Sequence, residues 1–129
     1  YGIDPAEQGG DSGNDYVIIS YADVLLMKAE ALLRQGDETG ALAIVNDIRS
    51  RAGAAARTTL STDDLLEERG FELAWEGVRR QDLIRFGKFT DAWELKEVTG
   101  EDHIKLFPIP FSALGANPNL EQNPGYPAE

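Results

Sequence analysis

Hydrophobic residues recur at three- and four-residue spacing along two consecutive segments in the first half of the chain. The first segment runs from about Ser20 to Gln35, and its apolar positions are Ala22, Leu25, Leu26, Ala29, Leu32 and Leu33. The second runs from about Glu38 to Ala52, and its apolar positions are Ala41, Leu42, Val45 and Ile48. This spacing predicts two amphipathic helices. Gly36 and Gly53 follow the two segments and are placed to end them.

Only a short turn separates the two predicted helices, so they are expected to pack antiparallel. Small residues stand where the backbones would meet: Ala29, Gly36 and Ala41. This arrangement is similar to one helix–turn–helix unit of a tetratricopeptide repeat. A single unit of this kind cannot bury its own apolar face. The pair must therefore stack on a third helix of the chain or on chain outside the sequence.

A third helical pattern begins at Ser61 or Thr62, with acidic residues in its first turn, and runs to about Gly77. A shorter or bent helical piece is expected to continue over residues 78–88. Trp75 lies within the apolar stripe of the third helix, which predicts that it belongs to the core.

The rest of the chain has no helical period. Residues 90–101 are polar and mixed, and 105–111 should be extended because each proline fixes φ and disfavours helix before it. Asn-Pro and Pro-Gly pairs mark turns in the tail, where Tyr126 is expected to act as a packing anchor. The predicted fold class is mainly α: a tetratricopeptide-like helix pair, a third long helix and an irregular extended C-terminal segment.

The first 15 residues contain glycine, proline and acidic residues but no Lys or Arg, which predicts a flexible lead or loop over 1–15. Asp11, Asn14 and Asp15 do not have the spacing of a calcium-binding loop, so a solvated turn is the preferred interpretation. Residues 16–129 are expected to form one helical domain.

Composition narrows the possible functions. The chain has 129 residues, 12 Lys+Arg against 23 Asp+Glu and a formal net charge of −11, which argues against nucleic acid as a partner. There is no Cys, hence no disulfide and no Cys-ligated metal, and no apolar run long enough to span a membrane. His103 is the only His, and a surface or hydrogen-bonded role suits it better than general-base catalysis. We therefore predict no catalytic residue, metal site or cofactor.

Three glutamates of the third helix, Glu68, Glu72 and Glu76, lie on one face at four-residue spacing, where like charges repel. The arginines available to compensate them are Arg49, Arg51, Arg79, Arg80 and Arg85. We predict an Arg–Glu network that fixes the third helix to the helix pair. The alternative is a glycosidase carboxylate pair, but such pairs normally flank a cleft from separate elements.

Trp93 stands among polar residues, beside Asp91, Glu94, Lys96 and Glu97. An aromatic ring in such surroundings either stacks on a sugar ring or covers a small core from its rim. Both interpretations remain open at this point, and Trp93 is the candidate ligand-binding residue.

Five segments, taken in order, resemble the C-terminal region of the SusD/RagB family. They are YADVLLMKAEALLRQG (21–36), VNDIRSRAG (45–53), ERGFELAWEGVRRQDLIRFGK (68–88), LFPIP (106–110) and ANPNLEQNPGY (116–126). Each segment alone is weakly specific, but their order and the NPNLEQNPGY ending are strongly so. Ser20 and Ala113 depart from the family pattern, which often has Arg and an acidic residue there.

The resemblance implies a surface-exposed outer-membrane lipoprotein of Bacteroidetes-type bacteria that captures glycans or other nutrients. Its partner would be a SusC-like TonB-dependent transporter, on which such proteins act as a lid, and it would not be an enzyme. Family members are several-fold longer and carry a signal peptide and a lipid-bearing Cys. We therefore expect a fragment, located at the extracellular face of the outer membrane through an anchor that this chain lacks.

Two other functions remain open. The chain could be a free-standing tetratricopeptide-like protein-interaction module that uses its helix pair as a groove, or a fragment of a helical glycosidase. The residues matched to the family have the character of scaffold, so no ligand residue can be transferred by motif.

Overall fold

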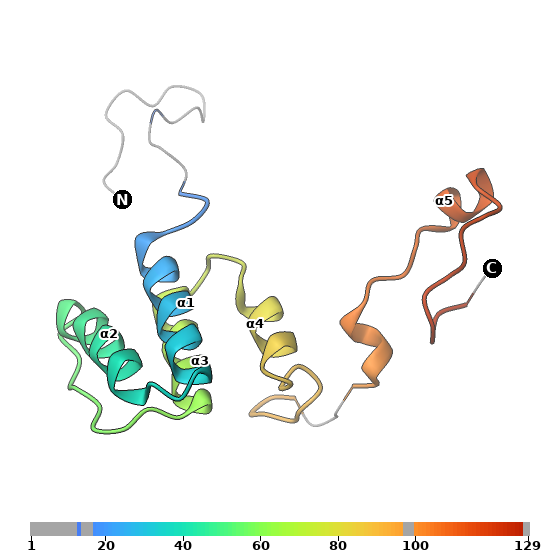
Figure 1. Ribbon diagram of the computed structural model, residues 1–129. Helices are drawn as coiled ribbons and strands as arrows, with labels where there is room; N and C mark the ends of the chain where they lie inside the picture. Colours follow the sequence, from blue (N-terminus) through green and yellow to red (C-terminus); the bar gives the residue numbers. More distant parts are fainter. Residues whose placement is uncertain (1–12, 14–16, 97–99, 128–129) are drawn as a thin grey trace. The chain divides into compact units, whose positions relative to one another are not determined.

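The computed structural model describes residues 13, 17–96 and 100–127 (Figure 1). Its helices are α1 (Tyr21–Arg34), α2 (Glu38–Arg51), α3 (Thr62–Glu72), α4 (Arg79–Arg85), the 3-10 helix η1 (Asp102–Lys105) and α5 (Phe111–Ala116). These described residues contain no β-strand, only one isolated bridge, which confirms the mainly α fold class. The predicted lead over 1–15 and its calcium-loop alternative lie outside the described residues, apart from Gly13.

Contacts divide the chain into two compact units, residues 1–72 and 73–129, and each unit is described by itself. We call them unit 1 and unit 2.

Helices α1 and α2 form the predicted pair, with bounds within one residue of those expected. The side chain of Ser20 accepts a hydrogen bond from Asp23 N at 3.2 Å, and Asp37 caps α2 by accepting from Gly40 N at 2.9 Å. Gly36, with φ of +88°, allows the chain to turn between them, a conformation that costs glycine little.

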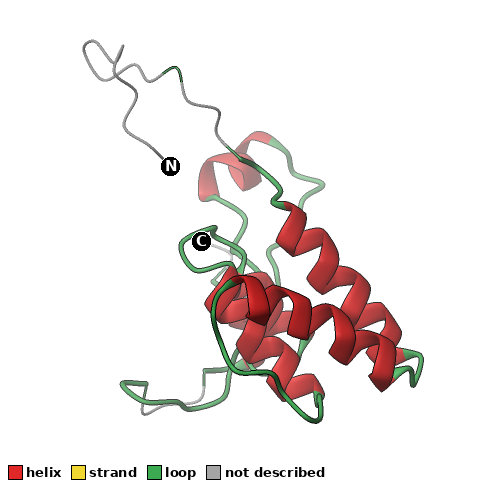
Figure 2. Ribbon diagram, turned by 90° about the vertical axis from the view of Figure 1, so that its left-hand side faces the viewer, coloured by secondary structure: helices red, strands yellow, loops and turns green. Residues whose placement is uncertain are grey.

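All three helices of unit 1 contribute buried side chains to its core. Their ribbons lie together in Figure 1, and Figure 2 shows the chain turned by 90° from that view. Ala29 of α1 and Ala41 of α2 have no exposed surface, so the small residues lie where the two helices pack closely, as predicted. Leu26, Val45 and Leu65 are the largest fully buried side chains, one from each helix. Helix α3 packs on α1 and supplies the third partner that the helix pair requires.

The third helix ends at Glu72, before the predicted end near Gly77. Leu73 is the last buried residue of its apolar stripe. Trp75 has φ of +69° and is fully exposed, so the prediction that it lies in the core is wrong. The reason is that the helical period stops after Leu73: the chain turns through Trp75 and Gly77, both with positive φ, and no longer follows one helical face.

In unit 2, α4 is shorter than the helical piece predicted over 78–88, because the chain leaves the helix at Phe86 and Gly87. The predicted extended stretch 105–111 is extended at its centre, whereas Lys105 ends η1 and Phe111 begins α5.

The tail folds back on this extended stretch through side chains that bind its backbone. Gln122 accepts a hydrogen bond from Ile109 N at 2.8 Å and donates one to Ile109 O at 2.9 Å. Asn123 donates to Phe107 O at 2.7 Å, and the Tyr126 hydroxyl donates to Leu106 O at 2.8 Å. We call this set of contacts the tail clip. It confirms Tyr126 as a packing anchor and joins the LFPIP segment to the QNPGY segment.

Candidate functional site

The acidic face of α3 carries ion pairs to α2 in unit 1. Arg49 Nη1 donates to Glu68 Oε2 at 2.6 Å, and its Nε donates to Ala55 O at 2.7 Å. Arg51 pairs with Glu72 at the more exposed end of the same face. The two glutamates are therefore held by arginines of the neighbouring helix, and both lie on one helix, whereas a hydrolytic carboxylate pair normally comes from separate elements.

Arg57, in the loop between α2 and α3, is the centre of this network, and the sequence did not single it out. Its guanidinium lies 2.7 Å from Asp64, 2.5 Å from Glu67 and 3.6 Å from Glu68. Asn46 fixes the backbone of the same residue, accepting from Arg57 N at 2.8 Å and donating to Arg57 O at 3.0 Å. The sequence feature that could have indicated this role is that Arg57 is a single arginine a few residues before a helix whose first turn is acidic.

These contacts alter the acid–base behaviour of the loop. The hydrogen bond to Glu67 raises the pKa of the Arg57 guanidinium, with the charges of Asp64, Glu67 and Glu68 adding to the effect. Hydrogen bonds from the Ser61 hydroxyl and backbone, followed by the charge of Arg57, lower the pKa of the Asp64 carboxyl. Both shifts favour the charged forms, which is expected of groups that hold the loop in place.

A second ion pair that the sequence did not reveal joins α3 to α1. Arg69 Nη2 lies 2.9 Å from Asp23 Oδ1, and the arginine side chain is only 4% exposed. Buried pairs of this kind are costly to break from one side, because the remaining charge loses its partner.

The other residues predicted for the network lie in unit 2. Arg85 pairs with Asp82 at 2.8 Å on α4, and Arg79 begins the same helix. Glu76 is exposed, and it makes no ion pair with any described residue of unit 2. The structure thus brings together Arg49 with Glu68 and Arg51 with Glu72 within unit 1, whereas Glu76 belongs to unit 2.

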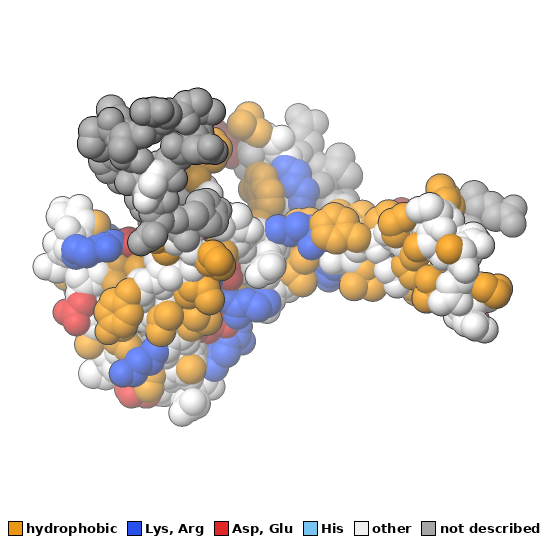
Figure 3. All heavy atoms as spheres, turned by 90° about the horizontal axis from the view of Figure 1, so that it is seen from above, with side chains coloured by type: hydrophobic (Ala, Val, Ile, Leu, Met, Phe, Trp, Pro, Cys, Tyr) orange, Lys and Arg blue, Asp and Glu red, His pale blue; other side chains and the backbone are white. Residues whose placement is uncertain are grey.

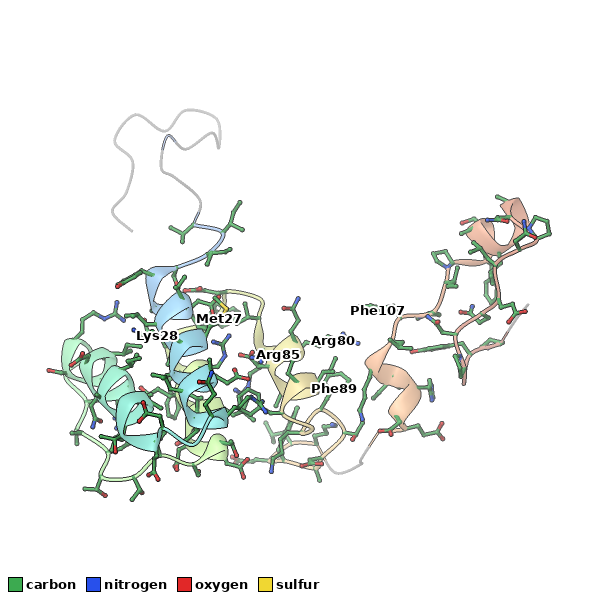
Figure 4. All side chains as sticks on the ribbon, viewed as in Figure 1. Met27, Lys28, Arg80, Arg85, Phe89 and Phe107 are labelled. Carbon is green, nitrogen blue, oxygen red and sulfur yellow. The ribbon has the colours of Figure 1, made fainter. Side chains whose placement is uncertain are left out.

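Unit 2 contains a row of alternating aromatic rings and cations. The Arg80 guanidinium lies 4.3 Å from the centroid of the Phe107 ring and 5.0 Å from that of Phe89 (Figure 4). The Lys96 ammonium lies 5.8 Å from the Phe89 ring and 4.5 Å from the Trp93 ring. These separations are those of cation–π contacts. We call the five residues the aromatic–cation ladder.

Hydrogen bonds hold both cations of the ladder in place. Arg80 donates to Ile104 O at 3.0 Å and to Lys105 O at 3.1 Å, which ties α4 to η1. Lys96 donates to Phe89 O at 2.7 Å and to Asp91 O at 3.0 Å. The ladder is exposed at both ends, since Phe107 is 73% and Trp93 47% exposed. An exposed ring on a fixed support is able to stack on a flat apolar surface of a ligand.

His103 is placed for a structural role. Its Nδ1 lies 3.1 Å from Glu101 Oε2, and its ring packs edge-on against Tyr126 with centroids 4.8 Å apart. Gly125 passes so close that an added Cβ would lie 2.5 Å from the imidazole Cγ. Over the described residues, no group of three or more His, Cys, Asp and Glu side chains could hold a metal ion. In the same part of the chain, no helix has the length and apolar character needed to cross a membrane.

A shallow cleft of about 710 Å³ lies between α5 and the tail. Its lining residues are Phe111, Leu114, Gly115, Pro118, Leu120, Glu121 and Gln122. The lining is mostly apolar, and the Gln122 amide is already bonded to Ile109. Ligand pockets usually present several convergent polar groups, which this cleft does not.

Comparison with known proteins identifies relatives of one kind. The model of the SusD family matches residues 4–105. The starch-binding protein SusD of Bacteroides thetaiotaomicron is 35% identical over 122 residues, covering 87% of this chain and 22% of the relative. The SusD-like protein P38 of Formosa agariphila is 35% identical over 123 residues, and the match covers 85% of this chain and 24% of the relative.

Solved structures agree with the sequence comparison. A SusD-like protein from Bacteroides fragilis superposes with a TM-score of 0.72 at 28% identity, covering 84% of this chain and 25% of its own. Surface glycan-binding protein A from Bacteroides uniformis superposes with a TM-score of 0.70 at 30% identity, and the match covers 82% of this chain and 27% of that protein. The chain therefore spans about a quarter of the length of these relatives.

Proposed function

The chain belongs to the SusD family, and on this premise we propose that it is part of a surface protein that captures glycans. The observation that carries the proposal is the family match over residues 4–105. Two relatives support the choice of ligand: one is named a starch-binding protein and another a surface glycan-binding protein. Neither name fixes which glycan this protein takes.

We further propose that the captured oligosaccharide passes to a SusC-like TonB-dependent transporter. In this proposal the protein sits on the extracellular face of the outer membrane through a lipid anchor. Purification from outer membranes in mild detergent tests it. We expect a TonB-dependent barrel to purify with the protein in an equal amount. If the protein stays in the aqueous fraction and no barrel purifies with it, the proposal is contradicted.

The contacts of the side chains that could act as acids or bases are consistent with a protein that binds its ligand without catalysis. Glu68 and Glu72 are engaged by arginines, and His103 is packed against Tyr126. A general acid needs a free proton on a raised-pKa carboxyl close to its substrate. In this chain the two carboxylates instead hold arginines of the neighbouring helix.

Affinity electrophoresis of the full chain encoded by the gene provides the test. Gels containing starch, xyloglucan, pectin or arabinoxylan should retard the protein in at least one case, without release of reducing ends. Migration unchanged by every polysaccharide of a broad panel would contradict glycan capture. Release of reducing ends, lost in Glu72→Gln, would show that the protein is an enzyme.

A second candidate function is a protein-interaction module, and one observation favours it. Apolar side chains at the start of α1 are exposed, among them Ile18, Ile19 and Tyr21. Hydrophobic side chains also gather on the face of unit 1 seen at the left of Figure 3. Exposed apolar groups of this kind mark contact surfaces. The double variant Ile18→Ser and Tyr21→Ser would then abolish partner binding while leaving glycan retardation unchanged.

A further inference from the structure

We propose that the turn at Trp93–Lys96 is a binding element for a neutral oligosaccharide. The exposed surface of the Trp93 indole stacks on a pyranose ring, and Lys96 supports the indole through its cation–π contact. This inference rests on the proposed glycan capture and assigns the sugar contact to Trp93. Its starting point is the exposed end of the aromatic–cation ladder.

The turn is closed by its own backbone. Trp93 N donates to Lys96 O at 3.2 Å, and Lys96 N donates to Trp93 O at 2.8 Å. Leu95 lies between them with φ of +70°, a conformation that favours glycine and is strained for leucine. Strain of this type persists where the surrounding contacts impose it, and it is concentrated at functional sites. The backbone thus fixes where the indole is presented.

Lys96 lies over the Trp93 indole, and part of the Trp93 side chain remains exposed. Its ammonium lies 4.5 Å from the ring centroid, while Trp93 keeps 47% of its surface in solvent. The negative face of an aromatic ring attracts the partly positive C–H groups that line one side of a pyranose. A ring already ordered by Lys96 loses little conformational entropy when the sugar stacks on it.

The charge around the turn selects against acidic glycans. Asp91 and Glu94 flank Trp93 in the sequence, and both are exposed. With Lys96, residues 91–96 carry two carboxylates against one ammonium, and the whole chain has a formal net charge of −11, so a polyanionic glycan is repelled while a neutral sugar finds acceptors for its hydroxyls. The chemistry therefore points to neutral hexose or pentose chains.

Substitution of the two tryptophans gives a matched test. Trp93→Ala should weaken binding of the polysaccharide that retards the wild-type protein by about tenfold or more, with an unchanged melting temperature. Trp75→Ala removes the other exposed indole of the chain and should leave the affinity unchanged. Equal affinity of Trp93→Ala and wild type would overturn this inference while leaving glycan capture intact. Binding of no glycan by the wild type would overturn both.

Trp93→Phe separates stacking from packing. The phenyl ring fills a similar space but offers a smaller face, so affinity should fall severalfold while stability is kept. If Trp93→Ala lowers the melting temperature strongly and Trp93→Phe binds like the wild type, Trp93 covers a core and the proposal fails.

Fluorine NMR of protein labelled with 5-fluorotryptophan locates the contact directly. The Trp93 resonance is the one that disappears in Trp93→Phe. Titration with maltoheptaose and xylohexaose should shift this resonance with at least one sugar and leave that of Trp75 in place. Polygalacturonate is the acidic control and should shift neither. A stationary Trp93 resonance at saturating neutral glycan would overturn the inference.

Discussion

Individual charges in unit 1 differ in how much they support the fold. Arg57 is 20% exposed and contacts three carboxylates, whereas Arg51 is 64% exposed and contacts one. Hydrogen bonds between charged groups are strong when solvent is excluded, and exposed pairs contribute little. The environment of each arginine therefore decides its contribution.

Arg57→Met should destabilise the protein by about 2 kcal/mol, because three carboxylates lose their shared cation. Arg51→Met is the matched control, and it should cost well under about 1 kcal/mol. Urea unfolding followed by circular dichroism gives both values. Equal losses for the two variants would contradict the central role of Arg57.

The pH dependence of stability should carry the signature of Asp64. Its pKa in the folded protein lies below the usual 3.8, so its contribution is present above that value and is lost as the pH falls through the folded pKa. The unfolding free energy should drop below about pH 4, and Asp64→Asn should reduce the drop. Asp47→Asn, at an exposed position on α2, is the matched control for the removal of one carboxylate. Parallel profiles for wild type and Asp64→Asn would contradict the prediction.

At the scale of elements, the tail clip replaces a β-ladder with side-chain hydrogen bonds. The extended stretch at Leu106–Pro110 contains two prolines, which cannot donate to a neighbouring strand. Gln122 bonds instead to both backbone groups of Ile109, and Asn123 bonds to the Phe107 carbonyl. An irregular segment can thus be fixed without secondary structure.

Gln122→Ala should loosen this stretch locally. Both bonds to Ile109 are lost, so exchange of the Ile109 amide hydrogen should speed up by about tenfold. Glu121→Ala changes the exposed neighbour and should leave that rate unaltered. Hydrogen exchange measured by NMR reads out the single amide, and an unchanged rate in Gln122→Ala would refute the clip.

Features set by residues close in the sequence could be predicted from it, whereas contacts between distant positions could not. Helices α1 and α2 follow from local periodicity and local caps, and both were predicted closely. Arg49 and Arg51 could be expected near Glu68 and Glu72 because they end the neighbouring helix. Arg57 could not, since a loop residue shows no period. The aromatic–cation ladder joins residues from Arg80 to Phe107, and no spacing rule relates such distant positions.

Trp75 is a residue for which local periodicity gave a wrong prediction. Periodicity placed it on the apolar stripe, but the helix had already ended, and the residue points into solvent. Helix ends are set by the competition between packing and turn-forming residues, here Gly77, and a hydrophobic pattern alone does not locate them.

At the scale of the whole molecule, the division into two units has a consequence for folding. Unit 1 contains its own core, with Leu26, Val45 and Leu65 fully buried, and its ion pairs are internal. A segment with a complete core is expected to fold by itself, although one this small is only marginally stable.

A fragment of residues 17–72 should therefore be helical and unfold cooperatively, with a free energy of unfolding of about 3 kcal/mol or less. Leu26→Ala removes a fully buried side chain, at a cost of about 2–5 kcal/mol, and should leave the fragment unfolded. Val24→Ala is the control on the same helix, because Val24 is largely exposed and its loss should cost little. Far-UV circular dichroism in urea distinguishes the three proteins. A fragment without helical signal would mean that unit 1 depends on chain outside it, and equal effects of both variants would mean that its core is not the source of its stability.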